Sequence, residues 1–78
     1  MVDINGVLQK MKDKDVYTIF DMGNAWLVSA VPKGKKLEDY SDILFRVDKQ
    51  FGGITEYAPM DNPKQFKNAL KHAVYKRR

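Results

Sequence analysis

The sequence predicts a small α+β domain of two layers, with the element order α-β-β-β-β-α. The main observation is residues 41–58, where apolar and polar residues alternate as they do in a β-hairpin. Both ends of the chain instead carry apolar residues at helical spacing. We therefore expect a four-stranded, mostly antiparallel sheet with both helices packed on one face. Seventy-eight residues make one domain, spanning 1–78.

The first helix is predicted from an apolar stripe near the beginning of the chain. The stripe has the spacing i, i+3, i+4 and i+7 and consists of Ile4, Val7, Leu8 and Met11. Asp3 is a suitable N-cap, because its side-chain oxygen can accept a hydrogen bond from a backbone N–H of the first turn. A short connection at 13–15 leads from this helix to the strands.

Two strands are predicted next, at 16–21 and 25–31, with a turn between them. The second strand is apolar on both faces, which is typical of a strand in the middle of a sheet. Pro32 ends it. The longest connection follows, and residues 37–40 are expected to form one helical turn there.

The predicted hairpin continues to Ala58, and its turn contains Gly52 and Gly53, which suit a positive φ. The last helix begins at Asn62, because an Asn N-cap followed by Pro63 is a strong start signal. Its apolar stripe consists of Phe66, Ala69, Leu70, Ala73 and Val74. Members of this stripe, Phe66 and Leu70 above all, are expected to be buried against the sheet.

Composition excludes several classes of function. The absence of cysteine removes disulfides and thiolate metal sites and favours a reducing cytoplasm. The apolar runs are too short to span a membrane, and the first residues do not resemble a signal peptide. The one histidine, His72, lies in a basic segment and is interpreted as a surface or boundary residue. We expect no metal, no cofactor and no catalytic site, so the protein is predicted not to be an enzyme.

Charge is distributed unevenly along the chain. The last fifteen residues contain six basic side chains and no acidic one, although the net charge of the whole chain is only +4. Lys64, Lys67 and Lys71 stand at spacings of three and seven, so they share a solvent face of the predicted last helix, and Tyr75 and Arg78 extend this row. Such a row could follow the phosphates of a nucleic acid. The other interpretation is a solvated face whose charges favour the helix dipole.

Four aromatic residues are surplus to the predicted core and are candidates for a protein-contact surface: Trp26, Tyr40, Phe51 and Tyr57. Phe51 lies in the predicted hairpin turn. An apolar aromatic residue in a turn either folds back under the sheet or marks a contact surface, where exposed aromatics are enriched.

Some of these features resemble known families. Trp26 on a strand, the segment 46–49 (Arg-Val-Asp-Lys), Gly53-Ile54, and Asn62-Pro63 before a helix resemble YrhB-like immunity-type domains of bacteria. That resemblance implies a small cytoplasmic protein that binds another protein. The element order and the lysines that begin the last helix also resemble double-stranded-RNA-binding domains, which implies binding to RNA.

The sequence thus favours a non-enzymatic, cytoplasmic protein–protein interaction module of bacterial or phage origin, of the mobile-element or immunity/inhibitor type. Its partner would be another protein or a second copy of the chain. The alternative is a nucleic-acid-binding module that uses the basic C-terminal helix.

Overall fold

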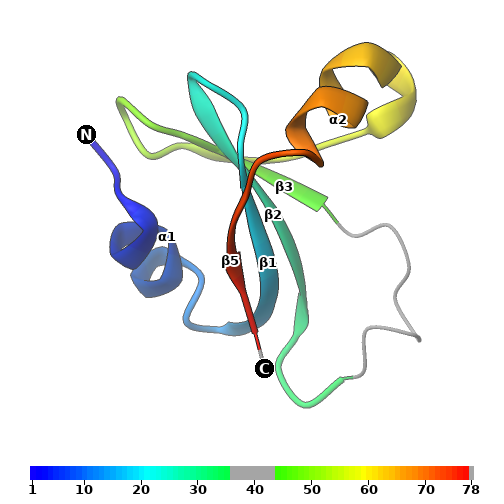
Figure 1. The fold of residues 1–78 in the computed structure, drawn as a ribbon. Coiled ribbons are helices and arrows are strands. Elements are labelled where there is room, and N and C mark those ends of the chain that lie inside the picture. Colours follow the sequence, from blue (N-terminus) through cyan, green and yellow to red (C-terminus); the bar gives the residue numbers. More distant parts are fainter. Residues whose placement is uncertain (36–43, 78) are drawn as a thin grey trace.

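The computed structural model describes residues 1–35 and 44–77 (Figure 1). The predicted helical turn at 37–40, together with Tyr40, lies outside them. The elements in chain order are α1 (Ile4–Lys10), β1 (Lys14–Asp21), β2 (Ala25–Pro32), β3 (Leu44–Asp48), β4 (Ile54–Glu56), the 3-10 helix η2 (Pro59–Asp61), α2 (Pro63–Ala69) and β5 (Ala73–Lys76). Within these two ranges, no helix is long and apolar enough to cross a membrane.

The strands form one antiparallel sheet in the order β4-β3-β2-β1-β5. The predicted α+β class and the antiparallel hairpins are confirmed. β2 is the central strand, as its two apolar faces indicated. The sheet has five strands in the part of the chain that the structure describes, so the prediction of four strands is wrong.

The main core lies between α1 and one face of the sheet. Val7 of α1 and Met11, its C-cap, pack against three residues of the sheet, and all five side chains are buried: Val7, Met11, Ile19, Val28 and Val47. The predicted N-cap is confirmed, because Asp3 Oδ1 accepts a hydrogen bond of 2.7 Å from the backbone N–H of Gly6. The apolar stripe of the first helix therefore has the register that the sequence predicted.

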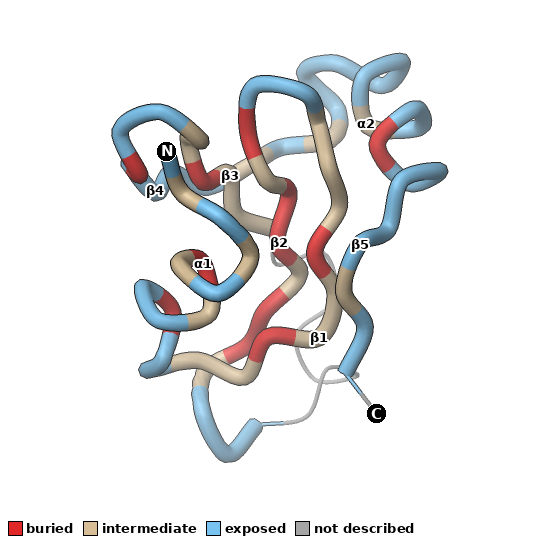
Figure 2. The backbone as a smooth tube through the Cα atoms, turned by 60° about the vertical axis from the view of Figure 1, so that its left-hand side comes forward, coloured by how far each residue is buried: buried red, intermediate tan, exposed pale blue. Residues whose placement is uncertain are grey.

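The opposite face of the sheet is also covered. Leu27 points away from α1, because side chains alternate along β2, and it is completely buried. Tyr57 follows β4 on the same face as Leu44, and its ring packs on Phe66 of α2 with 6.4 Å between the ring centroids. Figures 1 and 2 show α1 and α2 on opposite sides of the sheet. The prediction of both helices on one face is therefore wrong, since a central strand that is apolar on both faces needs cover on both.

The largest difference from the prediction lies at the C-terminal end. The last helix does not continue through Val74; it ends at Ala69, and after a turn the chain pairs with β1 as strand β5. Ala69 is buried, but Leu70 is 44% exposed and Val74 is 43% exposed. The predicted burial of Leu70 is thus wrong. The physical reason is that β1 would otherwise have an open edge, and β5 pairs with its backbone groups.

Candidate functional site

Three segments that are far apart in sequence meet at one end of the sheet: the N-terminal residues, the β1–β2 turn and the β3–β4 turn (Figure 1). The backbone N–H of Val2 donates to the carbonyl of Lys49 over 2.6 Å, and the N–H of Lys49 donates to the carbonyl of Asn24 over 3.2 Å. An open pocket of about 450 Å³ lies between these segments. We call this region the turn surface and define it as Met1, Asn24, Gln50 and Phe51.

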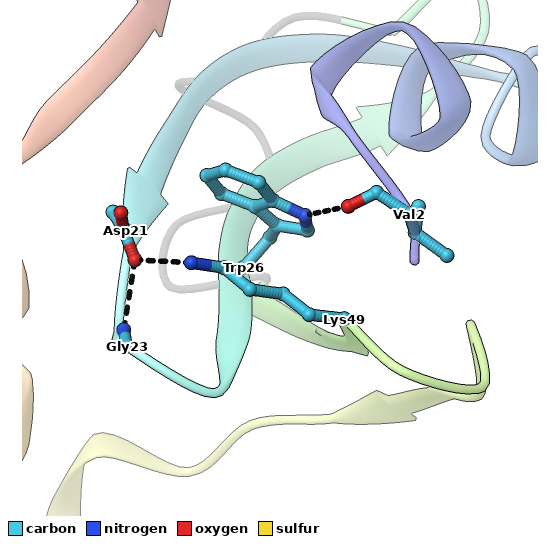
Figure 3. A network of polar contacts seen from close by, with 5 residues as sticks. All are labelled: Val2, Asp21, Gly23, Trp26 and Lys49. Carbon is cyan, nitrogen blue, oxygen red and sulfur yellow. Dashed lines mark hydrogen bonds and ion pairs between the residues drawn. The ribbon is translucent and has the colours of Figure 1, made fainter.

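A polar network beneath the turn surface connects the same three segments (Figure 3). The indole Nε1–H of Trp26 donates to the carbonyl of Val2 over 2.8 Å. The ammonium of Lys49 lies over the indole, 4.2 Å from the ring centroid, and donates to Asp21 Oδ1 over 2.7 Å. Each segment is therefore bonded to at least one of the others.

The Asp21 carboxylate is stabilised in its charged form. The hydrogen bond from Lys49 is the main cause that lowers its pKa, and a second hydrogen bond of 2.8 Å from the N–H of Gly23 adds to it. Burial acts in the opposite direction but is a smaller effect. An ionised carboxylate with two donors fixes the β1–β2 turn next to Lys49.

The backbone of the β3–β4 turn is held in place around Phe51. The N–H of Phe51 donates to Asp48 Oδ2 over 2.6 Å, and the N–H of Gly52 donates to the Asp48 carbonyl over 2.9 Å. Gly52 has a φ of 77° and is buried, and a Cβ at this position would lie 2.7 Å from Lys10 Cε. The turn therefore packs against α1, while the side chain of Phe51 is 82% exposed.

The other predicted contact aromatics have structural roles where the structure describes them. Trp26 is half-buried and packs against the main core. Tyr57 is half-buried against Phe66 and donates its hydroxyl to Gln65 Oε1 over 3.1 Å. Burial, and secondarily the charge of Asp61, raises the pKa of Tyr57. Of the predicted aromatics within 1–35 and 44–77, Phe51 alone presents its ring to solvent, and the interpretation that it folds back is wrong.

The predicted basic row is not a single helical face. Lys64 and Lys67 lie exposed on α2, whereas Lys71 lies in the turn that follows. Tyr75 is on β5 and packs against the main core on the α1 side of the sheet. Arg78 lies outside the described residues. The predicted row is therefore divided among a helix, a turn and a strand.

His72 is exposed, which agrees with its interpretation as a surface residue. It lines an open pocket of about 290 Å³ together with Asp21 and Asn68, among others. Among the residues placed by the structure, no group of three His, Cys, Asp or Glu side chains could hold a metal ion.

Sequence reasoning did not identify the network of Trp26, Lys49 and Asp21. Asp21 and Lys49 are 28 positions apart, and no local pattern connects them. In comparisons with known proteins, no family model, curated protein or solved structure matches this chain significantly. Function is therefore inferred from the geometry of the surface.

Proposed function

We propose that this chain is a small, non-enzymatic protein-binding module and that the turn surface is its contact site. The observation that carries the proposal is the side chain of Phe51, which is 82% exposed on a turn whose backbone is hydrogen-bonded and packed against α1. Burial of this large apolar side chain in a partner would stabilise the complex, because removing apolar surface from water is favourable.

Rigidity adds to this argument. A mobile loop must become ordered when it binds, and that ordering reduces the affinity. The turn of Phe51 is already ordered by Asp48 and by its contact with Lys10, so less conformational entropy remains to be lost. Rigid aromatic residues near the centre of an interface commonly contribute much of the binding energy. Met1, which is fully exposed, and the neighbouring pocket would provide the surrounding contact area.

The partner in this proposal is a cytoplasmic protein with an apolar pocket that accepts the Phe51 ring, or a second copy of the chain. The resemblance to YrhB-like immunity-type domains supports a role of the immunity or inhibitor type in a bacterium or phage. The polar residues around the pocket, Asn24 and Gln50, would form the rim of such an interface.

The experiment is site-specific photocrosslinking in the cells from which the chain comes. A photoreactive phenylalanine analogue at position 51 is expected to yield a discrete covalent adduct. The same analogue at Met60 is the control, because Met60 is 90% exposed on η2 and lies outside the turn surface. Light scattering of the purified protein measures its molar mass in solution, and a dimer would indicate that the partner is a second copy of the chain.

The expected result is an adduct from position 51 that is absent from position 60. The adduct formed through a second photoreactive residue at Gln50 is expected to disappear when Phe51→Ser is introduced. Adducts of equal yield and identity from positions 51 and 60 would contradict the proposal, because random collision would then explain both.

A second candidate function, nucleic-acid binding, is favoured by one observation. Residues 62–77 contain five basic side chains and no acidic one. Lys64, Lys67 and Lys71 are all exposed, although they do not share one helical face. Binding through phosphates weakens steeply with salt, and Lys64→Glu with Lys67→Glu is expected to abolish it. No retention of the unmodified protein on DNA or RNA at low salt would exclude this function.

A further inference from the structure

We infer that the outer edge of β5 binds an extended, acidic segment of a partner protein as an additional strand of the sheet. This site is separate from the turn surface, and the inference does not depend on the role of Phe51. It concerns β5 and the adjoining Arg77, which form the edge of the sheet next to β1, together with the preceding turn residues Leu70 and Lys71.

One side of the β5 backbone pairs with β1, and on its other side the structure places no strand among residues 1–35 and 44–77. The N–H of Arg77 donates to the carbonyl of Tyr17 over 2.8 Å, and the carbonyl of His72 accepts from the N–H of Asp21 over 2.9 Å. Backbone groups alternate between the two sides of a strand in an antiparallel pair. Since the N–H of Arg77 points to β1, the N–H of Lys76 points to the outer edge. Such an edge can pair with another extended chain.

The side chains along this edge define the chemistry of the added strand. Leu70 and Val74 are 44% and 43% exposed and offer apolar contacts. Lys71 and Lys76 are exposed beside them, and Arg77 is bonded to Asp15 at 3.2 Å. Tyr75 packs on the α1 side of the sheet, so the side chain of Lys76 points to the opposite face. An incoming strand that alternates acidic and apolar residues would place its acidic side chains beside Lys76, where opposite charges on neighbouring strands are stabilising, and its apolar side chains beside Tyr75.

Two other partners are less suitable at this edge: a second copy of the chain and a nucleic acid. Two β5 strands from two copies would bring lysines together, and like charges on neighbouring strands are destabilising. A nucleic acid could satisfy the lysines but would not pair with a row of backbone N–H and carbonyl groups. The other edge strand, β4, is less suitable, because it has three residues and Pro59 follows it closely. The arrangement favours an acidic peptide at β5.

The probe is a short fluorescein-labelled peptide of alternating Glu and Val, with a matched Lys and Val peptide as control. Fluorescence anisotropy at low salt is expected to show saturable binding of the acidic peptide alone. Amide chemical shifts from NMR are expected to change mainly along 73–77, and the exchange of the Lys76 N–H with solvent is expected to slow. Phe51→Ser is expected to leave this binding unchanged, which separates this site from the turn surface.

A pair of variants at one position separates backbone pairing from charge. Lys76→Gln removes the charge and keeps the outward N–H, whereas Lys76→Pro removes both and leaves the bonds to β1 unchanged. Proline is tolerated at edge strands of this kind. We expect Lys76→Pro to bind the peptide about tenfold more weakly than Lys76→Gln, as the loss of one hydrogen bond at an interface predicts.

Three results would overturn the inference. Equal affinities of Lys76→Pro and Lys76→Gln would mean that charge alone attracts the peptide. Shift changes outside β5 would place the peptide elsewhere, and this measurement uses the unmodified protein, so it stands even if the proline variant fails to fold. Tighter binding of an oligothymidine to the same amides would identify the edge as a nucleic-acid surface.

Discussion

The part of the molecule from α1 to β3 and the part from α2 to β5 differ in how they use apolar residues. Val7, Ile19 and Val28 in the first part are completely buried. In the second part, Leu70 and Val74 are each more than two-fifths exposed. Figure 2 shows the same contrast, with buried residues along β1 and β2 and exposed ones along most of β5.

The two parts therefore differ in how much they contribute to the stability of the fold. A part with many buried apolar side chains contributes most of the free energy of folding, whereas a part with few opens more readily. The C-terminal part is held to the sheet largely by strand pairing with β1, and it leaves Leu70, Val74 and several lysines at the surface. Both proposed contact sites use residues that the core does not need.

The largest expected effect is that of Leu27→Ala. Leu27 is completely buried on the sheet face opposite α1, so the substitution removes apolar contacts and leaves a cavity. A cavity of this kind typically costs about 2–5 kcal/mol, which is a large share of the stability of a domain of this size. The midpoint of urea unfolding measures the loss.

Leu70→Ala is the matched control, because it removes the same atoms from the exposed part. We expect it to lower the free energy of unfolding by less than about 1 kcal/mol. Equal losses for Leu27→Ala and Leu70→Ala would contradict the contrast between the two parts, and Leu70 would then belong to the core.

The contrast also explains which elements the sequence could predict. The stripe of α1 and the apolar faces of β2 are local patterns with one strong interpretation, and both are confirmed. The segment 66–75 fits helical spacing, yet Val74 and Tyr75 also suit a strand. The open edge of β1, a tertiary feature, decides between them. Local spacing could not show that edge, so the predicted helix was too long.

The turn surface was predictable only in part. The position of Phe51 in a turn indicated either a contact surface or a ring that folds back under the sheet, and the structure places the ring in solvent. The conformation of this turn involves Gly52, which packs against Lys10 and Val2 of a distant segment. The pairing of Asp21 with Lys49 is equally non-local. Such contacts follow from the sheet register, which single-sequence patterns do not provide.

The second prediction tests whether the turn of Phe51 is fixed by its packing against α1. Gly52→Ala would put a Cβ 2.7 Å from Lys10 Cε at a φ of 77°, which side chains disfavour. The left-handed conformation alone costs a non-glycine residue about 1–2 kcal/mol. We expect a loss of this size in the free energy of urea unfolding.

Gly53→Ala is its control in the adjacent position, where nothing lies within 4 Å of an added Cβ. This variant is expected to have a much smaller effect. If both alanine variants unfold at the urea concentration of the parent, the turn is not held against α1 and the argument from rigidity fails.

The third prediction concerns pH and the network below the turn surface. The pKa of Asp21 lies below its ordinary value of 3.8, chiefly because of the hydrogen bond from Lys49. A lowered pKa in the folded state adds stability above about pH 3.8, and that stability is lost as the pH falls through the folded value. The difference in unfolding midpoint between the parent and Asp21→Asn should therefore be largest near neutral pH and should shrink below about pH 3.

Asp13→Asn is the comparison for this titration. Asp13 is exposed, and its carboxylate lies 3.8 Å from the ammonium of Lys14, so its ion pair should contribute little. We expect its unfolding midpoint to follow that of the parent at every pH. A pH-independent difference for Asp21→Asn would show that the ion pair with Lys49 does not stabilise the fold.

The smallest expected effect on stability is that of Phe51→Ala, and it is the one on which the proposed function depends. The side chain is 82% exposed, so its removal uncovers little buried surface, and the free energy of unfolding should change by less than about 0.5 kcal/mol. The backbone bonds of the turn remain, since the N–H groups of residues 51 and 52 both donate to Asp48. A loss above about 1 kcal/mol would mean that the ring supports the fold. Stability equal to that of the parent, combined with loss of the partner adduct, would mean that the ring serves recognition alone.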